Sequence, residues 1–161
     1  MLCVSVSLWQ TTEASNVKNG SKRARRNFCY ICGADNPQGM RLKFSVDSEE
    51  AIVRGAFSLA HRYQGPPSSA HGGVIASLVD EAMGKLNRVD GIVALTAEIT
   101  VEYLRLVPLG RKILVEARPS EHRGRNYWRE CTIHDAKGKL LVRGRGRFVK
   151  VAVRDDASNS E

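Results

Sequence analysis

The sequence predicts an α+β fold in which a curved, mostly antiparallel sheet of five to six strands wraps one long central helix. Two observations support this prediction. Residues 72–87 have the one clear helical periodicity of the chain, and several long segments of alternating apolar and polar residues follow it. Two shorter strand patterns precede the helix. A chain of 161 residues is long enough to bury one self-sufficient core, so we expect one domain.

Turn residues separate the expected strands. The first two strands are expected at 40–46 and 51–57, and a loop containing Gly65-Pro66-Pro67 is expected at 58–69. The segment 92–104 alternates well, with its apolar side chains on one face and Thr96 on the other. The remaining strands are expected at 112–121, 125–134 and 140–151. In the last of these, Gly144 and Gly146 allow one face to approach the helix closely.

The helical segment is amphipathic, and its second face consists mostly of small residues. The apolar half of the helical wheel consists of Val74, Ile75, Leu78, Val79, Ala82, Met83 and Leu86. The other half holds Gly73, Ala76, Ser77, Asp80, Gly84 and Asn87. A solvated face would hold more Lys, Glu and Gln. Asp80 is therefore expected in a narrow groove, the alternative being an ordinary surface aspartate on an amphipathic helix.

The start of this helix suggests carbonyl chemistry. His71-Gly72-Gly73 places two glycine N–H groups at a helix N-terminus, where unpaired donors and partial positive charge suit a developing oxyanion. Gly72 and Asp80 are eight residues apart, which separates them by about 12 Å along one helix. One carbonyl cannot contact both groups of the same chain. A catalytic function of both residues therefore requires at least a homodimer, in which Gly72 of one subunit faces Asp80 of the other.

Composition limits the class of protein. With 42% hydrophobic residues and no apolar run of about eighteen, the chain resembles an ordinary globular protein without a membrane span. The first nine residues lack a preceding basic region, so we do not expect a signal peptide. The irregular spacing of the four cysteines argues against a disulfide framework and favours a reducing, cytoplasmic setting. We expect a basic, disordered leader at 1–27, one domain at 28–151 and a polar tail at 152–161.

Several motifs together resemble those of the hotdog-fold acyl-CoA thioesterases, in particular the PaaI-like (4-hydroxybenzoyl-CoA thioesterase) superfamily. They are Gln64-Gly65-Pro66-Pro67, Ala70-His71-Gly72-Gly73, Asp80-Glu81-Ala82, Thr96-Ala97-Glu98-Ile99, Tyr103-Leu104-Arg105 and Pro108-Leu109-Gly110. Cys29-Tyr30-Ile31-Cys32-Gly33 also resembles an entry segment of bacterial members. The resemblance covers residues 28–150. It implies hydrolysis of an acyl-CoA thioester by dimers or tetramers, with no metal and no cofactor besides the CoA of the substrate.

The resemblance also implies roles for individual residues. Asp80 is similar to the catalytic acid, acting as nucleophile or as general base on water. The Gly72 N–H is similar to the oxyanion donor, with His71 positioning the carbonyl or the loop, and Gly73 lies at the substrate. Thr96 matches a hydroxyl that orients water or the acid. It lies on the face opposite the apolar row, so it reaches the site only through a bulge or from the dimer side, and a purely structural threonine is the alternative.

One departure from the family pattern concerns position 65. Several PaaI-like enzymes have Asn or Gln six residues before the motif histidine, where this chain has Gly65. The neighbouring Gln64 is the candidate substitute for that contact with the substrate or with water. A non-catalytic acyl-CoA-binding protein is therefore a second hypothesis. A hydratase is a weaker one, because the helix has no histidine after its start.

The basic residues suggest a phosphate contact. Arg143, Arg145 and Arg147 form a one-sided ladder, which together with Arg105, Arg123 or Arg125 is a candidate site for the phosphates of CoA. A solvated or subunit-packing face is the alternative. The net charge of +8 also suggests nucleic-acid binding as an alternative function. No aromatic residues alternate with the basic ones, which argues against it.

The cysteines favour structural roles. Cys29 and Cys32 are a single CxxC pair, whereas a zinc site needs about four ligands, and no spacing rule recruits His61 as a third. No metal is expected. Cys131 and His134 lie on opposite faces of a strand, which argues against a catalytic pair.

Overall fold

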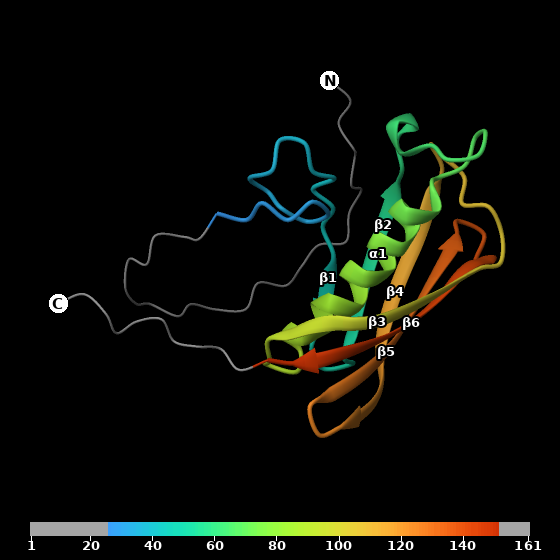
Figure 1. Cartoon of the computed structure of the whole chain (residues 1–161). Coiled ribbons are helices and arrows are strands. Elements are labelled where there is room, and N and C mark those ends of the chain that lie inside the picture. Colours follow the sequence, from blue (N-terminus) through green and yellow to red (C-terminus); the bar gives the residue numbers. More distant parts are fainter. Residues whose placement is uncertain (1–25, 152–161) are drawn as a thin grey trace. The chain divides into compact units, whose positions relative to one another are not determined.

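A computed structural model describes residues 26–151, whose helices and strands are drawn in Figure 1. These residues fall into two units divided between Leu42 and Lys43, and each unit is described by itself. The expected leader at 1–27 lies outside the described residues except for Arg26 and Asn27, and the expected tail at 152–161 lies outside them entirely. Over 26–151, none of the helices has the length and apolar character required to span a membrane.

The described part of the first unit, residues 26–42, consists of tight turns. The Gly33 N–H donates to the Cys29 carbonyl at 2.9 Å, and the Asp35 carboxylate accepts from the Asn27 N–H at 2.7 Å. A Cβ at position 33 would lie 2.4 Å from the Cys29 carbonyl oxygen. Only glycine therefore fits this turn, which holds the CxxC segment.

The strand predicted at 40–46 is wrong for its first five residues, because strand β1 is Ser45–Asp47. The N–H groups of Met40 and Leu42 donate to the carbonyls of Tyr30 and Ile31, at 2.7 and 2.9 Å. Arg41 between them has a φ of 53°, which interrupts an extended strand. This segment of alternating apolar residues therefore pairs locally with the turn that contains Tyr30 and Ile31.

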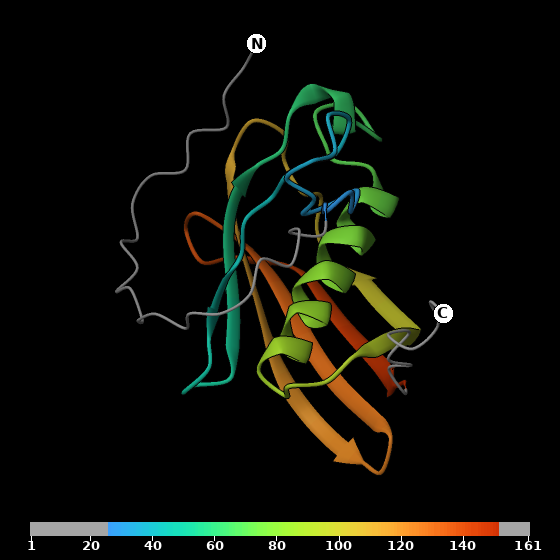
Figure 2. The same cartoon turned by 90° about the vertical axis from the view of Figure 1, so that its left-hand side faces the viewer.

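The second unit, described over 43–151, is a six-stranded sheet with one long helix along one face (Figure 2). The strand order is β1-β2-β4-β5-β6-β3, and all neighbouring pairs are antiparallel. The elements after β1 are β2 (Ile52–Ser58), η1 (His61–Tyr63), α1 (Gly72–Lys85), η2 (Leu86–Arg88), β3 (Ala94–Tyr103), β4 (Lys112–Arg123), β5 (Asn126–Asp135) and β6 (Leu140–Lys150). This arrangement confirms the predicted hotdog fold.

The core lies between α1 and the sheet. The predicted apolar half of α1 is buried apart from Val74, which is partly exposed. The helix lies close to β6, because a Cβ at Gly144 would lie 2.2 Å from Val79 Cγ1 and one at Gly146 would lie 2.8 Å from Met83 Cε. The two glycines thus allow the helix to approach the sheet, as the sequence indicated.

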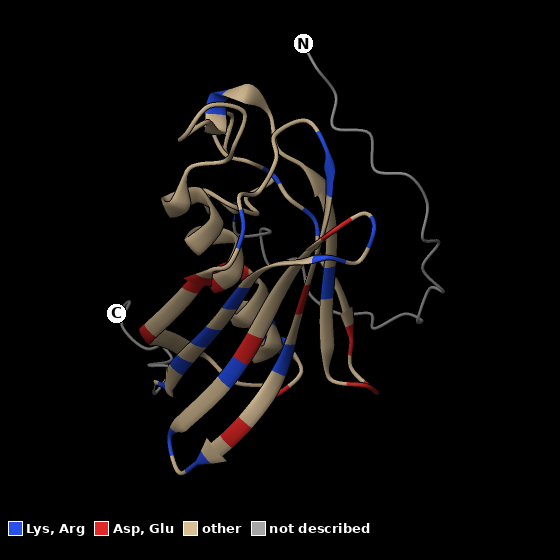
Figure 3. Ribbon diagram, turned by 90° about the vertical axis from the view of Figure 1, so that its right-hand side faces the viewer, with Lys and Arg blue, Asp and Glu red and all other residues tan. Residues whose placement is uncertain are grey.

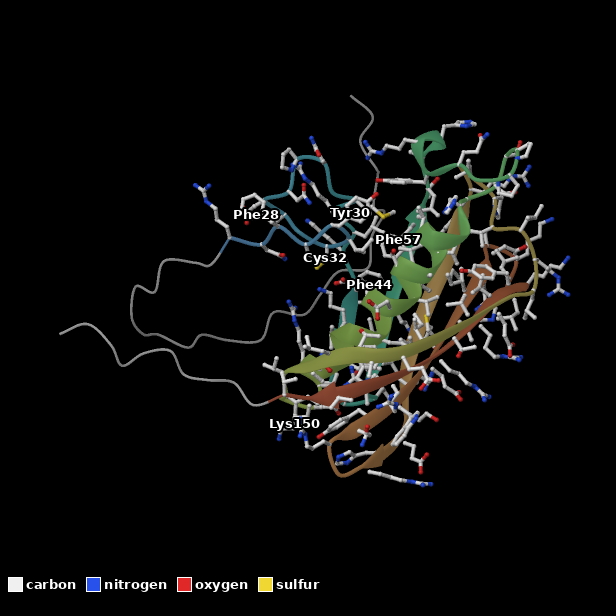
Figure 4. The ribbon with its side chains drawn as sticks, in the orientation of Figure 1. Phe28, Tyr30, Cys32, Phe44, Phe57 and Lys150 are labelled. Carbon is white, nitrogen blue, oxygen red and sulfur yellow. The ribbon has the colours of Figure 1, made fainter. Side chains whose placement is uncertain are left out.

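Aromatic packing closes the core at its first strands. Phe44 precedes β1 and meets Phe57 of β2 edge to face, with 4.9 Å between ring centroids (Figure 4). This geometry places the positive edge of one ring on the negative face of the other. The short strand β1 is thereby anchored to β2 by side chains as well as by its backbone pairing.

A bulge in β3 changes which side chains face the helix. Thr96 pairs with Phe148 of β6, but the next pair is Glu98 with Arg147, so Ala97 is an extra residue. Side chains alternate between faces along a strand, and the extra residue reverses that alternation. Thr96 therefore shares the helix face with Ile99, Val101 and Tyr103, whereas simple alternation placed it opposite them.

On the face of the sheet turned away from α1, charged side chains of β3, β5 and β6 form ion pairs. Figure 3 shows where the basic and acidic residues lie along the strands. The ladder arginines of β6 each meet a glutamate on a neighbouring strand: Arg143 with Glu102 at 3.1 Å, Arg145 with Glu130 at 3.5 Å and Arg147 with Glu98 at 3.5 Å. Exposed pairs of this kind add little stability. They do compensate the positive charge of the ladder across three strands.

One arginine is buried beneath the C-terminal end of α1. Arg129 of β5 is 1% exposed, donates to the Met83 carbonyl at 2.7 Å, and pairs with Asp90 at 2.5 Å. Burial lowers the pKa of Arg129, and the carboxylate of Asp90 opposes this effect. A guanidinium at this point also meets the negative end of the helix dipole, which favours its charge. Arg129 thus attaches the helix end to the sheet.

Candidate active site

Helix α1 begins with most of its first N–H groups already hydrogen-bonded. His71 is the N-cap in an extended conformation, and its Nδ1 accepts from the Gly73 N–H at 3.0 Å. The His71 carbonyl accepts from Val74 at 3.0 Å and from Ile75 at 3.2 Å. Over residues 26–151, the Gly72 N–H has no acceptor. Since a helix N-terminus has partial positive charge, this N–H is suited to bind an external oxygen atom.

Backbone contacts hold the loop that precedes α1. The His71 N–H donates to the Tyr63 carbonyl at 2.8 Å, and Gln64 and Ala70 form an antiparallel bridge. A Cβ at Gly65 would lie 2.7 Å from His71 Cα, closer than real contacts allow. The loop therefore folds directly against His71, and an Asn or Gln at position 65 would not fit without a backbone shift.

Gln64, the predicted substitute for that missing side chain, is exposed and turned toward η1. Its Oε1 lies 3.4 Å from Nδ1 of His61. No hydrogen bond joins the Gln64 side chain to His71 in the described part of the chain. Its role at the substrate stays a prediction.

Asp80 lies two turns further along α1, and a hydroxyl of the sheet holds its carboxylate. Thr96 Oγ1 donates to Asp80 Oδ1 at 2.7 Å. This contact exists because of the bulge at Ala97, which turns Thr96 toward the helix. Of the two routes by which Thr96 was expected to reach the site, the bulge is the one that the single chain uses. This bond uses only one of the two carboxylate oxygens of Asp80. The residue is partly exposed.

A groove of about 330 Å³ opens beside Asp80. Thr96, Gly84 and Asn87 line it together with the apolar side chains of Ala94, Leu95 and Phe148. Besides Asp80, its charged members are Glu81 and Lys85, which pair at 2.8 Å, and the exposed Arg88. Apolar side chains next to a held carboxylate suit a substrate with a carbon chain and a reactive polar group.

The predicted phosphate-binding arginines do not lie together in one chain. Arg105 follows β3 at the end near Tyr103, where it donates to the Leu140 carbonyl at 2.8 Å. Arg123 and Arg125 flank the turn between β4 and β5, at the opposite end of the sheet. Arg123 pairs with Glu121, and Arg125 donates to the Lys150 carbonyl at 3.2 Å. No described contact links any of these arginines to His71 or Asp80, and their part in substrate binding stays a prediction.

Tyr103, which the sequence analysis quoted within a motif but gave no role, lies at the start of α1. Its hydroxyl donates to the Gly72 carbonyl at 2.9 Å, from the last residue of β3. A Cβ at Gly72 would lie 3.6 Å from the ring, so the phenol lies against the helix start. In the sequence, Tyr103 belonged to the apolar row of its strand, and alternation alone gives no sign of this hydroxyl contact.

Comparisons with known proteins show similarity to thioesterases. Residues 68–142 match the family model described as the thioesterase superfamily. The acyl-coenzyme A thioesterase THEM4 of Rattus norvegicus is 32% identical over 89 residues, which cover 55% of this chain and 38% of that protein. The chain thus matches well under half the length of this curated relative.

Two solved structures resemble the chain in fold. A thioesterase superfamily protein, RHA08564, aligns with a TM-score of 0.71 and 31% identity over 77% of this chain and 63% of its own. The protein smu.793 of Streptococcus mutans UA159, solved bound to acetyl CoA, aligns with a TM-score of 0.63 and 19% identity, covering 70% of this chain and 92% of its own. Residues 68–142, which match the thioesterase superfamily model, lie within a hotdog-fold unit, and the fold of that unit is shared with solved thioesterase structures.

Proposed function

We propose that the protein hydrolyses an acyl-CoA thioester to the free acid and CoA. One observation supports this proposal above the others: within residues 26–151 the Gly72 N–H at the start of α1 has no acceptor, and Thr96 fixes the Asp80 carboxylate further along the same helix. The first group suits a carbonyl oxygen that gains negative charge, and the second suits the attack on its carbon. The similarity to a relative named as an acyl-coenzyme A thioesterase supports the same reaction.

Two copies of the chain are needed for the reaction. Gly72 and Asp80 belong to one continuous helix, so about 12 Å separate them. We infer a dimer in which the Gly72 N–H of one protomer faces Asp80 of its partner. The position of β3 supports this arrangement, because it is an end strand of the sheet with exposed Leu95 and Ile99. Further association into tetramers is part of the same proposal.

The proposed steps use only protein groups and water. The thioester oxygen accepts from the Gly72 N–H, and Asp80 removes a proton from water as the water oxygen attacks the carbonyl carbon. The tetrahedral oxyanion then collapses, the C–S bond breaks, and CoA leaves as a thiolate. In the covalent variant, an Asp80 oxygen attacks the carbon first, and water hydrolyses the resulting anhydride. Thr96 holds Oδ1 in both variants, which directs Oδ2 to the reaction.

The acyl group is expected in the groove beside Asp80. Its wall of Ala94, Leu95 and Phe148 is apolar, and burying a carbon chain there contributes about 0.8 kcal/mol per methylene. The acetyl CoA bound to the Streptococcus mutans relative supports a CoA ester as the ligand class. We extend the proposal to the reducing, cytoplasmic setting that the cysteine spacing favours.

A non-catalytic acyl-CoA-binding protein is the second candidate, and Gly65 is the observation that favours it. The loop has no room for a polar side chain at that position, so one potential contact to water or substrate is missing. Nucleic-acid binding is less favoured, because glutamates pair with the arginine ladder. A cysteine nucleophile is disfavoured as well, since burial and the nearby Glu116 raise the pKa of Cys131 to about 12.

A screen for thiol release tests the proposal. Purified protein is incubated with short, long and aryl acyl-CoAs, and free CoA is detected over time. We expect turnover of at least one class, and a loss of orders of magnitude in Asp80→Asn, whose amide oxygen still accepts from Thr96. Circular dichroism and size-exclusion chromatography check that the variant stays folded and associated. Saturable binding without any turnover by the wild type would favour the second candidate, and unchanged turnover in Asp80→Asn would refute the assigned acid.

A further inference from the structure

The peptide group between Gly72 and Gly73 is held at both of its polar ends. Its carbonyl accepts from Tyr103 Oη at 2.9 Å, and its N–H donates to His71 Nδ1 at 3.0 Å. Two consecutive glycines are the most conformationally free residues with which to begin a helix. Without these contacts, the first turn would have little to fix the orientation of its peptide planes.

Packing does not explain why Tyr103 occupies this place. Its side chain is 53% exposed, so it is not a core residue. Its ring lies about as close to Gly72 as an ordinary van der Waals contact, where a Cβ would be 3.6 Å away. Beyond that contact, its specific interaction with the helix is the hydrogen bond from its hydroxyl group.

The strand β3 therefore holds both ends of the reactive part of the helix. Thr96 donates to the Asp80 carboxylate at one end, and Tyr103 donates to the Gly72 carbonyl at the other. The bulge at Ala97 puts both hydroxyls on the helix face of the strand. The bond to the Gly72 carbonyl restrains the ψ angle of Gly72. It thereby restrains the direction in which the N–H of Gly72 points.

We propose that Tyr103 is a positioning residue for the oxyanion site: together with His71, it clamps the Gly72–Gly73 peptide so that the Gly72 N–H is the donor offered to the substrate. The inference rests on the proposed thioester hydrolysis. In the ground state a misdirected N–H costs little, because water solvates it. In the transition state the oxyanion needs an aligned donor, so the clamp acts mainly on kcat.

Tyr103→Phe tests the proposal, since it keeps the ring against Gly72 and removes only the hydroxyl. Tyr127→Phe is the matched control, a phenol on β5 that stacks on His122 far from the helix start. We expect kcat to fall about fivefold in Tyr103→Phe, the loss of roughly one hydrogen bond, with KM changed less than twofold. The control should match the wild type in kcat and KM, and circular dichroism should show both variants folded at the assay temperature.

A second measurement does not depend on turnover. Amide hydrogen exchange at Gly73, followed by NMR, should be faster in Tyr103→Phe than in the wild type, because the clamp then has one end only. Unchanged kcat or unchanged Gly73 exchange would overturn the proposal, and so would a change confined to KM, which would make Tyr103 a substrate contact. A wild type that turns over no acyl-CoA would instead overturn the proposed function.

Discussion

Thr96 on the edge strand holds Asp80 on the helix, with 2.7 Å between Thr96 Oγ1 and Asp80 Oδ1. The bulge at Ala97 is the reason that this threonine faces the helix at all. The contact therefore depends on the register of β3 against β6, which connects the position of the acid to the folding of the sheet.

Replacing the Thr96 hydroxyl should lower the activity that depends on Asp80 without unfolding the protein. We expect Thr96→Val to lower kcat about tenfold, since hydrogen bonds to charged groups contribute roughly 1.5–3 kcal/mol. Thr96→Ser should keep most of the activity. Thr100→Val is the matched control, because Thr100 lies on the same strand but pairs with Arg145 on the opposite face. Steady-state kinetics with one acyl-CoA decide the matter, and equal losses in Thr96→Val and Thr100→Val would contradict a specific role.

Mixed dimers should recover activity if the site is shared between protomers. Gly72→Pro removes the N–H and should keep the helix start, because proline is well tolerated at the first helical position and the extended His71 suits a following proline. We expect Gly72→Pro and Asp80→Asn to be inactive alone. Refolded together in equal amounts, they should regain about a quarter of wild-type activity, since half of the dimers are mixed and each has one intact site.

Gly72→Ala, which keeps the N–H, is the control for the proline variant. It should retain activity, since a Cβ at Gly72 makes an ordinary contact with Tyr103. Size-exclusion chromatography and mass spectrometry show whether mixed dimers form in a 1:1 mixture of the two inactive variants. If mixed dimers form and the mixture stays inactive, both groups of one site belong to a single chain.

Gly84 should set the room for the acyl chain. It lines the groove beside Asp80, and a Cβ there would lie 3.9 Å from Phe148 Cε1, which is an ordinary contact. Gly84→Ala should therefore be tolerated and raise the free energy of unfolding by about 0.5–1 kcal/mol. Gly84→Leu should fill the groove and shift the preference toward shorter acyl-CoAs. The shift is measured as kcat/KM for a series of acyl-CoAs of increasing chain length. An unchanged series in Gly84→Leu would show that the acyl group binds elsewhere.

The buried thiol of Cys131 should make stability depend on alkaline pH. Burial, and to a smaller extent Glu116, raises the pKa of Cys131 from 9.0 to about 12. Its folded-state pKa thus exceeds the unfolded value, so its contribution is complete below pH 9 and declines as pH rises toward 12. The decline approaches about 1.4 kcal/mol per pH unit. Urea unfolding at pH 8 and pH 10.5 should give a larger loss for the wild type than for Cys131→Ala, and equal losses would contradict the prediction.

The sequence predicted the fold and the helix well because both depend on periodic burial. The helix was expected at 72–87 and extends over Gly72–Lys85, followed by the 3-10 turn Leu86–Arg88. The apolar half of its wheel is the half that packs on the sheet. The glycines of β6 were also predicted correctly, since a strand with alternating glycine has one face without side chains.

The errors and omissions have local causes. The residues 40–44 alternate like a strand, yet Arg41 adopts a left-handed conformation that no periodicity indicates. The face of Thr96 depends on one extra residue at Ala97, and a bulge leaves no mark in a polar and apolar pattern. The contact from Tyr103 to Gly72 joins residues 31 positions apart. Such contacts follow from the crossing of strand and helix and not from spacing along the chain.

The tight approach of Gly65 to His71 constrains how this sequence can change over time. A side chain at position 65 would meet His71 Cα at 2.7 Å, so no single substitution there restores the Asn or Gln of similar enzymes. The loop backbone would have to move first, through changes elsewhere in Gln64–Ala70 that bring no benefit by themselves. A polar side chain at position 65 is thus reached only through several changes in a fixed order, the loop backbone first and residue 65 second.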